Sequence, residues 1–170
     1  HFVEEPIVEP AAIALYHISR LARENATVLL SGEGSDEVFG GYFLYRFMQH
    51  VDILHTVIPR CLYPLLQTLG ARLNQDKYRK YTDWLQLPLE KRYQGTSSYL
   101  TSTLKAKYYN NNFFAHKSTY LEDSFSGYFN KVKDCDPLMQ MLYVDTKTWL
   151  VDDLLIKADK MTMATSVELR

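Results

Sequence analysis

The feature that most limits how this chain can fold is a short apolar run that leads directly into a glycine-rich acidic turn. Thr27 to Leu30 are apolar and partly β-branched, which is typical of a buried strand in a parallel sheet. The helical spacing of apolar residues behind Pro10 predicts a helix that ends near Asn25, just before this strand. A helix, a strand and a tight turn in this order predict a doubly wound α/β unit.

The chain after this unit is predicted to be mainly helical. Apolar residues at helical spacing predict a helix over residues 43–51, and Pro59 and Pro64 then break the pattern. Residues 70–82 are polar and predict a loop, and the three asparagines at 110–112 predict a turn. Shorter helices are expected over residues 88–93, 103–109 and 119–132.

A further helix start is marked by Asp136 and Pro137, which place an acceptor at the cap and a proline in the first turn. No strong helix breaker follows before Glu168, so one long helix or two consecutive helices are expected there. The predicted chain is therefore mostly α with one or few short strands. We divide it into an α/β segment at residues 1–42 and a helical part at residues 43–170, both taken from a larger α/β domain.

Composition narrows the class of protein. The chain has 19 Lys and Arg against 20 Asp and Glu, a net charge of -1, which argues against a dedicated nucleic-acid binder. No apolar run approaches the roughly 18 residues of a membrane span. Cys61 and Cys135 form no CxxC pair and are too few for a disulfide scaffold, which favours the reducing cytoplasm. The many aromatic residues between positions 93 and 129 are expected to pack between helices.

The glycine-rich turn carries the clearest chemical signal. Its two glycines let backbone N–H groups approach a ligand, and Ser35 is expected to cap a helix that begins at Asp36. The turn lacks the lysine of a Walker A loop and carries three carboxylates instead, on Glu33, Asp36 and Glu37. Carboxylates beside a phosphate require a divalent cation between them, usually Mg²⁺. A tight turn with an acidic helix start that only complements the helix dipole remains an equal alternative.

A second group of charged residues lies near the end of the chain. Asp153 and Lys157 stand four residues apart in the favourable acid-before-base order for one helix face. From physical chemistry alone, a solvated helix face with a few ion pairs explains this group best. Its members are Asp152, Asp153, Lys157, Asp159, Lys160, Glu168 and Arg170.

These two stretches resemble one known family. Residues 31–42, SGEGSDEVFGGY, look like the SGEGxDExFGGY motif of the glutamine-hydrolysing asparagine synthetases. Residues 153–170, DLLIKADKMTMATSVELR, are similar to a later stretch of the same family. The middle of the chain, about residues 45–135, is similar only in its helical character.

The resemblance implies an ATP-dependent amide ligase built on a Rossmann-like PP-loop ATPase domain. Such enzymes adenylate the side chain of aspartate, and ammonia from glutamine then displaces AMP to give asparagine. Carried over by motif, Ser31 and Gly32 would contact the AMP moiety, and Asp36 would bind the Mg²⁺ that holds pyrophosphate. Glu33 would lie near the aspartyl-adenylate and the incoming ammonia. A supporting role in the same site is implied for Glu37, Asp153, Lys157, Asp159 and Lys160.

Other parts of the family pattern are missing from the 170 residues. They are the SGGxDSS pyrophosphate loop, the glutaminase domain with its nucleophilic cysteine, and a lysine expected beyond Arg170. We therefore expect a segment that supplies one wall of a synthetase site and is inactive alone. Its strand at residues 27–30 would be frayed, covered by residues 1–9 or paired with a second copy of the chain. The resemblance implies aspartate, ammonia and ATP as partners, a cytoplasmic location, no nucleic acid and no membrane, and leaves a homodimer open.

Two other functions remain as alternatives. Relatives with the same fold close β-lactam rings, cyclise peptides or amidate sugar-pathway products. Glu33 favours the asparagine branch, because the ring-closing relatives tend to carry a tyrosine at that place. The second alternative is a helical interaction module without catalysis, in which the glycine-rich turn would have no chemical function.

Overall fold

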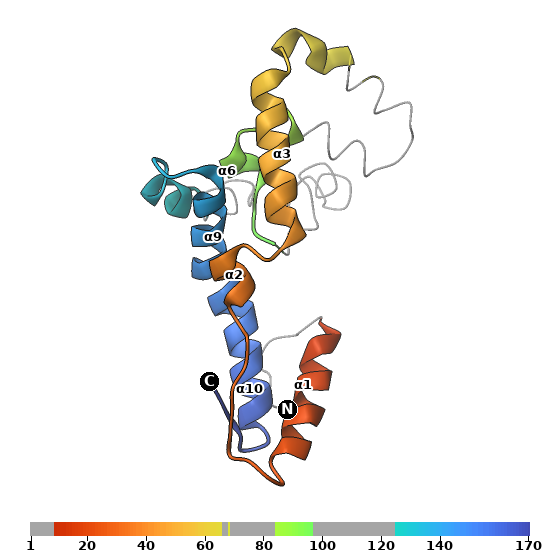
Figure 1. The fold of residues 1–170 in the computed structure, drawn as a ribbon, viewed down its shortest axis with the longest axis vertical. Helices are drawn as coiled ribbons and strands as arrows, with labels where there is room; N and C mark the ends of the chain where they lie inside the picture. Colours follow the sequence, from red (N-terminus) through yellow and green to blue (C-terminus); the bar gives the residue numbers. More distant parts are fainter. Residues whose placement is uncertain (1–8, 66–67, 69–83, 97–124) are drawn as a thin grey trace, which may run out of the picture.

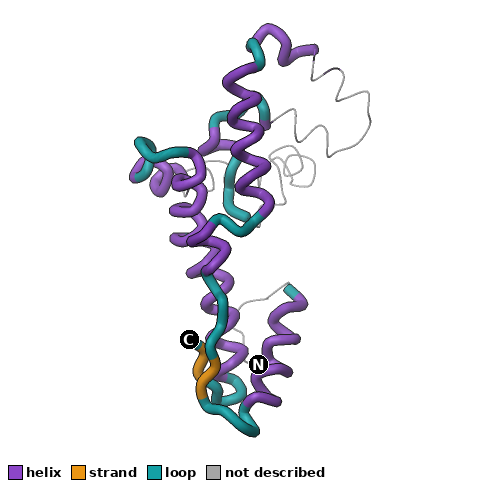
Figure 2. The backbone as a smooth tube through the Cα atoms, viewed as in Figure 1, coloured by secondary structure: helices purple, strands orange, loops and turns teal. Residues whose placement is uncertain are grey.

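The computed structural model describes residues 9–65, 68, 84–96 and 125–170, and this part of the chain is mostly helical with two short strands (Figures 1 and 2). Residues 125–131 are also helical. The elements are α1 (Pro10–Ala22), β1 (Val28–Leu29), α2 (Ser35–Phe39), α3 (Phe43–Val57), the 3-10 turn η1 (Arg60–Leu62), α6 (Leu89–Arg92), α9 (Pro137–Lys147), the π-helical segment η2 (Leu150–Leu155), α10 (Ile156–Met163) and β2 (Glu168–Leu169).

Helix α1 forms as predicted, with Pro10 in its first turn, and it ends at Ala22, before the expected Asn25. It lies beside α10 at one end of the molecule (Figure 1). Ala12 and Ser19 are buried on α1, and the Ser19 hydroxyl donates to the Leu15 carbonyl at 2.8 Å. Because Ala12 and Ser19 are small and the Ser19 hydroxyl is satisfied within its own helix, α1 and α10 can approach closely.

The predicted strand forms, but its partner was not among those expected. β1 pairs in parallel with β2 of the same chain, so the last residues of the chain lie beside the strand that follows α1. The Arg170 N–H donates to the Leu29 carbonyl at 2.9 Å, which extends the pairing by one residue. Burial of this strand was also wrong: Val28 is 43% exposed and Leu30 is 86% exposed. A two-stranded sheet has too few neighbours to cover its apolar side chains.

A column of three consecutive helical segments, α9, η2 and α10, runs through the middle of the molecule (Figure 1). Asp136 caps it as predicted, because its Oδ1 accepts from the N–H groups of Leu138 at 3.0 Å and Met139 at 3.2 Å. The helix does not continue to Glu168, however. It ends at Met163, and Ser166, with a φ of 61°, turns the chain into β2.

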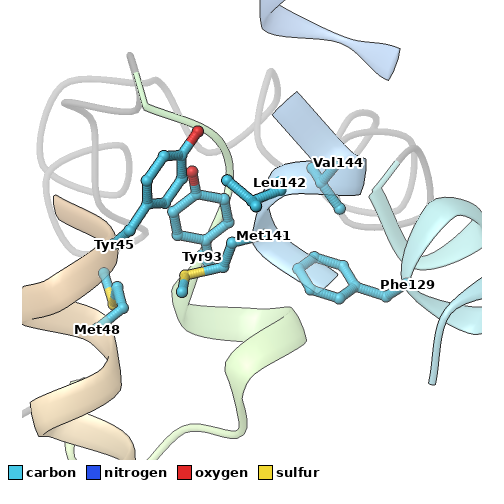
Figure 3. Close-up of a cluster of buried hydrophobic side chains, with 7 residues drawn as sticks. All are labelled: Tyr45, Met48, Tyr93, Phe129, Met141, Leu142 and Val144. Atoms are coloured by element: carbon cyan, nitrogen blue, oxygen red, sulfur yellow. The ribbon is translucent and has the colours of Figure 1, made fainter. Parts of the chain in front are cut away.

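The main core lies where α3, α6 and α9 meet, close to residues 125–131 (Figure 3). Figure 3 shows the two tyrosine rings side by side, with Met48 and Met141 beneath them. Phe125 and Tyr128 pack against this cluster, so the expected packing role of the aromatic residues is confirmed where the structure describes them. The buried members are Tyr45, Met48, Tyr93, Phe129, Met141, Leu142 and Val144.

Helix α3 is longer than the predicted segment 43–51, since it continues to Val57, and α6 confirms the helix expected over residues 88–93. The loop expected at 70–82, the turn at 110–112 and the helix at 103–109 lie outside the described residues. In the described part of the chain, no helix is both long and apolar enough to cross a membrane.

Candidate functional site

The two sequence motifs meet through backbone hydrogen bonds beyond the short sheet. We call residues 31–37 the glycine loop. The Ser31 N–H donates to the Arg170 carbonyl at 2.7 Å, so the first residue of the glycine loop is hydrogen-bonded to the last residue of the chain. The loop itself is closed by its serines. Ser31 Oγ accepts from the Glu33 N–H at 3.2 Å, and Ser35 Oγ donates to the Gly32 carbonyl at 2.6 Å. The sequence-predicted ligands Ser31, Gly32 and Glu33 are therefore held on one exposed turn.

Helix α2 begins one residue earlier than predicted. Gly34, with a φ of 88°, occupies the cap position, and Ser35 is the first helical residue. The prediction that Ser35 caps this helix is wrong, because its hydroxyl bonds back to Gly32 instead. A Cβ on Gly34 would lie 3.3 Å from the Leu150 side chain, so the turn rests directly on the start of η2.

Asp36 is exposed, and its conformation depends on the glycine pair that follows α2. Its backbone carbonyl accepts from the N–H groups of Gly40 at 2.9 Å and Gly41 at 3.0 Å. Its side chain leans over Gly41, where a Cβ would lie only 1.9 Å from Asp36 Oδ1. Glycine at position 41 thus leaves the space that the carboxylate occupies.

Glu37, the third carboxylate of the motif, does not face solvent. It is 1% exposed, and its Oε1 accepts a hydrogen bond from the Tyr42 hydroxyl at 2.5 Å. Burial raises the pKa of Tyr42 above its ordinary value, and the hydrogen bond to Glu37 raises it further. The phenol therefore keeps its proton and remains a donor to Glu37 at neutral pH.

The exposed carboxylates of Glu33 and Asp36 have the chemistry that a Mg²⁺ site requires. Mg²⁺ prefers oxygen ligands and is usually held by one or two carboxylates together with substrate phosphates. Among the described residues, no three metal-binding side chains gather closely enough to hold an ion by themselves. The exposed Asp36 carboxylate, which lies over Gly41, fits a cation that shares its ligands with a phosphate.

In the second motif, Lys157 is buried, and its ammonium group pairs with Asp153 at 3.1 Å. It also pairs with Glu9, just before α1, a partner that the sequence did not indicate. Burial lowers the pKa of Lys157, but the two carboxylates outweigh it and raise the pKa above its usual value. Asp159 is exposed and Lys160 half-buried on the same helix. The pair with Glu9 thus joins α10 to the start of α1, and the pair with Asp153 joins α10 to η2.

A second buried carboxyl group was missed by the sequence analysis. Asp145 is fully buried in α9, and its Oδ2 accepts three hydrogen bonds from hydroxyl groups. The donors are Tyr45 at 2.6 Å, Tyr93 at 2.5 Å and Thr96 at 2.6 Å. An acidic residue with apolar neighbours in a helix gives no sequence signal for such contacts, because its donors lie 49 to 100 positions away.

The described chain is therefore a mainly helical scaffold that presents an acidic glycine loop beside the second sequence motif at β2. The family model described as asparagine synthase matches residues 1–170. The chain belongs to the asparagine synthase family.

Its relatives carry names from the same family. Asparagine synthetase [glutamine-hydrolyzing] 1 of Bacillus subtilis is 37% identical over 174 residues, covering 100% of this chain and 26% of the relative. A protein of Mycobacterium tuberculosis that provisionally carries the same enzyme name is 33% identical, covering 99% of this chain and 26% of that protein. The chain thus spans about a quarter of the length of these relatives. No solved structure matches it significantly.

Proposed function

We propose that the chain forms one wall of the synthetase site of an enzyme that converts aspartate to asparagine with ATP and glutamine-derived ammonia. The observation that carries the proposal is the exposed acidic loop, bonded through Ser31 to the second family motif at Arg170. The match of the asparagine synthase family to the whole chain supports it. The proposed parent domain is a doubly wound α/β nucleotide-binding domain of the PP-loop ATPase type, located in the cytoplasm.

The proposed reaction has two steps. An oxygen of the aspartate side-chain carboxylate attacks the α-phosphorus of ATP, and the bond to pyrophosphate breaks. Ammonia then attacks the acyl carbon of the aspartyl-adenylate, loses a proton and expels AMP. Mg²⁺, when bound, neutralises the negative charge that develops on the pyrophosphate.

Each loop residue has a role that follows from its position. Ser31 and Gly32 present backbone groups to the AMP moiety, and close approach is open to them because the turn is exposed. Asp36 supplies the carboxylate for the cation from the space above Gly41. Glu33, also exposed, lies on the same turn and is free to face the acyl-adenylate and accept a proton from ammonia.

Lys157, Asp153 and Glu9 hold α10 against α1 and so support the second motif rather than bind the nucleotide. We propose that Asp159 and Lys160, which lie on α10 and are not buried, belong to the part of this helix that faces the site.

The test uses the natural protein that contains residues 1–170. Formation of asparagine, AMP and pyrophosphate from aspartate, ATP and glutamine is measured beside glutamine hydrolysis. Asp36→Asn should lower synthesis by about 100-fold or more, because an amide cannot replace the charged ligand of a hard cation. Glutamine hydrolysis should change far less, since its chemistry needs neither ATP nor the cation.

Glu24→Gln is the matched control, because Glu24 is exposed and lies just after α1, outside the glycine loop. Equal losses of the two activities in Asp36→Asn would contradict the metal role of Asp36. A protein that forms AMP and pyrophosphate only with another carboxylic acid would instead favour a ring-closing or peptide-cyclising ligase.

A further inference from the structure

The three carboxylates of the glycine loop lie in different environments. Asp36 and Glu33 are exposed, whereas Glu37 is 1% exposed and bonded to the Tyr42 hydroxyl. A carboxylate that is buried and already accepts a hydrogen bond from a phenol hydroxyl is poorly placed to coordinate a cation. The residue pattern alone does not separate the three, and the family resemblance gives the metal role to Asp36 and only a supporting role to Glu37.

The hydrogen bond between Glu37 and Tyr42 closes the short segment 37–42, which directly follows Asp36. Helix α2 carries Asp36 and Glu37, and the Gly40–Gly41 pair returns the chain toward Asp36, whose carbonyl accepts both glycine N–H groups. Tyr42 follows directly, and its hydroxyl reaches back to Glu37 at 2.5 Å. The side chain of Asp36 lies over Gly41, against this closed segment.

We infer that Glu37 and Tyr42 are a positioning pair, which holds the Asp36 carboxylate in place for the cation, and that Glu37 is not itself a ligand. The inference rests on the proposed role of Asp36. Residues that orient a metal ligand through hydrogen bonds typically change metal affinity 10- to 100-fold when they are substituted. The Tyr42 ring also lies 5.6 Å from the Tyr45 ring, centroid to centroid, which ties the pair to the core.

The two interpretations of Glu37 make opposite predictions for two conservative variants. Glu37→Gln keeps an amide oxygen that can accept the Tyr42 hydroxyl, so a positioning role predicts metal affinity within about threefold of the unchanged protein. Tyr42→Phe leaves a buried carboxylate without its donor and should weaken metal binding about 10-fold or more. If Glu37 were a ligand, Glu37→Gln would be as damaging as Asp36→Asn, and Tyr42→Phe would be mild.

The experiment measures Mn²⁺ binding by electron paramagnetic resonance, with a non-hydrolysable ATP analogue, in the natural protein that contains this chain. Hydrogen exchange at the amides of Gly40 and Gly41 is followed in the same variants, because it reports on the closed segment without any metal. Tyr63→Phe and Glu24→Gln are the controls, since Tyr63 donates to the His55 carbonyl and Glu24 is exposed.

We expect faster hydrogen exchange at Gly40 and Gly41 and weaker Mn²⁺ binding in Tyr42→Phe, and near-normal values of both in Glu37→Gln. Faster exchange with unchanged Mn²⁺ affinity would overturn it, as would loss of Mn²⁺ binding in Glu37→Gln while exchange stays normal. Asp36→Asn separates the two proposals. If that variant binds Mn²⁺ normally, the proposed metal role of Asp36 fails, whatever the Tyr42 variant does.

Discussion

Replacing Tyr45 by phenylalanine tests the buried polar cluster that joins the helices of the main core. Asp145 Oδ2 accepts hydroxyl hydrogen bonds from Tyr45, Tyr93 and Thr96, all between 2.5 and 2.6 Å. A single carboxylate oxygen accepts all three, and hydrogen bonds to a carboxylate are stronger than those between neutral groups. Such bonds contribute about 1.5–3 kcal/mol each to stability.

Tyr45→Phe removes one of the three donors and leaves the ring in place. Its expected cost is therefore about 1.5–3 kcal/mol in the free energy of unfolding, because the carboxylate keeps its other two donors. Asp145→Ala would leave three hydroxyls without an acceptor, at about 1–3 kcal/mol each, and should unfold the helical part of the chain. The single tyrosine variant is the measurable one.

The assay is urea unfolding of residues 1–170, followed by far-ultraviolet circular dichroism. At a typical denaturant slope, the expected loss moves the midpoint by roughly 1 M urea. Tyr63→Phe is the matched control, because its hydroxyl donates to a backbone carbonyl at 3.2 Å in a half-buried position, and it should cost well under about 1 kcal/mol. Equal midpoints for the two variants would refute the assignment of a charged hydrogen bond to Tyr45.

Four further predictions follow from the same structure. Burial, together with Asp145, raises the pKa values of Tyr45 and Tyr93, so the stability they contribute is present below about pH 10 and is lost as pH rises above it; phenolate absorbance should show both ionising only as the protein unfolds. Gly41→Ala should lower asparagine synthesis by about 100-fold in steady-state kinetics, because its Cβ takes the place of the Asp36 carboxylate. An unchanged rate would show that synthesis does not depend on the position of Asp36 over Gly41. Glu33→Gln should slow ammonia-dependent synthesis at saturating ATP while nucleotide binding stays nearly intact, and an unchanged rate would remove Glu33 from the mechanism. Residues 1–170 alone should neither make asparagine nor bind ATP tightly in calorimetric titration with Mg²⁺, since tight binding needs several converging donors, and one-to-one micromolar binding would contradict this.

The local elements were predictable because their signals are local. Pro10 and the Asp136–Pro137 pair mark helix starts through backbone geometry and a cap acceptor, and both helices begin there. Apolar spacing predicted α3, although Pro59 proved a better guide to its end than the pattern did. The glycine loop was identified correctly as a turn, because Gly34 adopts a φ of 88° that other residues avoid.

Long-range pairing was not predictable in the same way. Nothing in residues 27–30 indicates that their partner is β2, about 140 positions later, rather than another segment or copy. The last helix ends at Met163, and Ser166 then turns the chain with no glycine or proline to mark the turn, so the residues up to Glu168 were predicted to be helical. The partners of Lys157 and Asp145 were equally hidden, because an ion pair with Glu9 or a hydroxyl cluster depends on how distant helices pack.

The candidate site and the helical core share one support, which is the part of the helical column formed by α9 and η2. Gly34 lies against Leu150 of η2, and a Cβ on Gly40 would lie 3.7 Å from Leu138 and 3.9 Å from Leu142 of α9. The same α9 carries Asp145, which accepts a hydrogen bond from Tyr45, and the Tyr45 ring lies beside the Tyr42 ring at a tilt.

A change in the core can therefore reach the loop without contacting any ligand. Tyr45 carries both connections, since its hydroxyl binds α9 and its ring lies beside the ring of Tyr42. Loss of the hydroxyl loosens the helix on which the glycine loop rests and the ring that supports Tyr42. This coupling requires that Tyr45→Phe, besides lowering stability, weaken Mn²⁺ binding in the same direction as Tyr42→Phe and by a smaller factor. Mn²⁺ affinity that stays normal in Tyr45→Phe, at a temperature where the variant is fully folded, would show that core and loop are held independently.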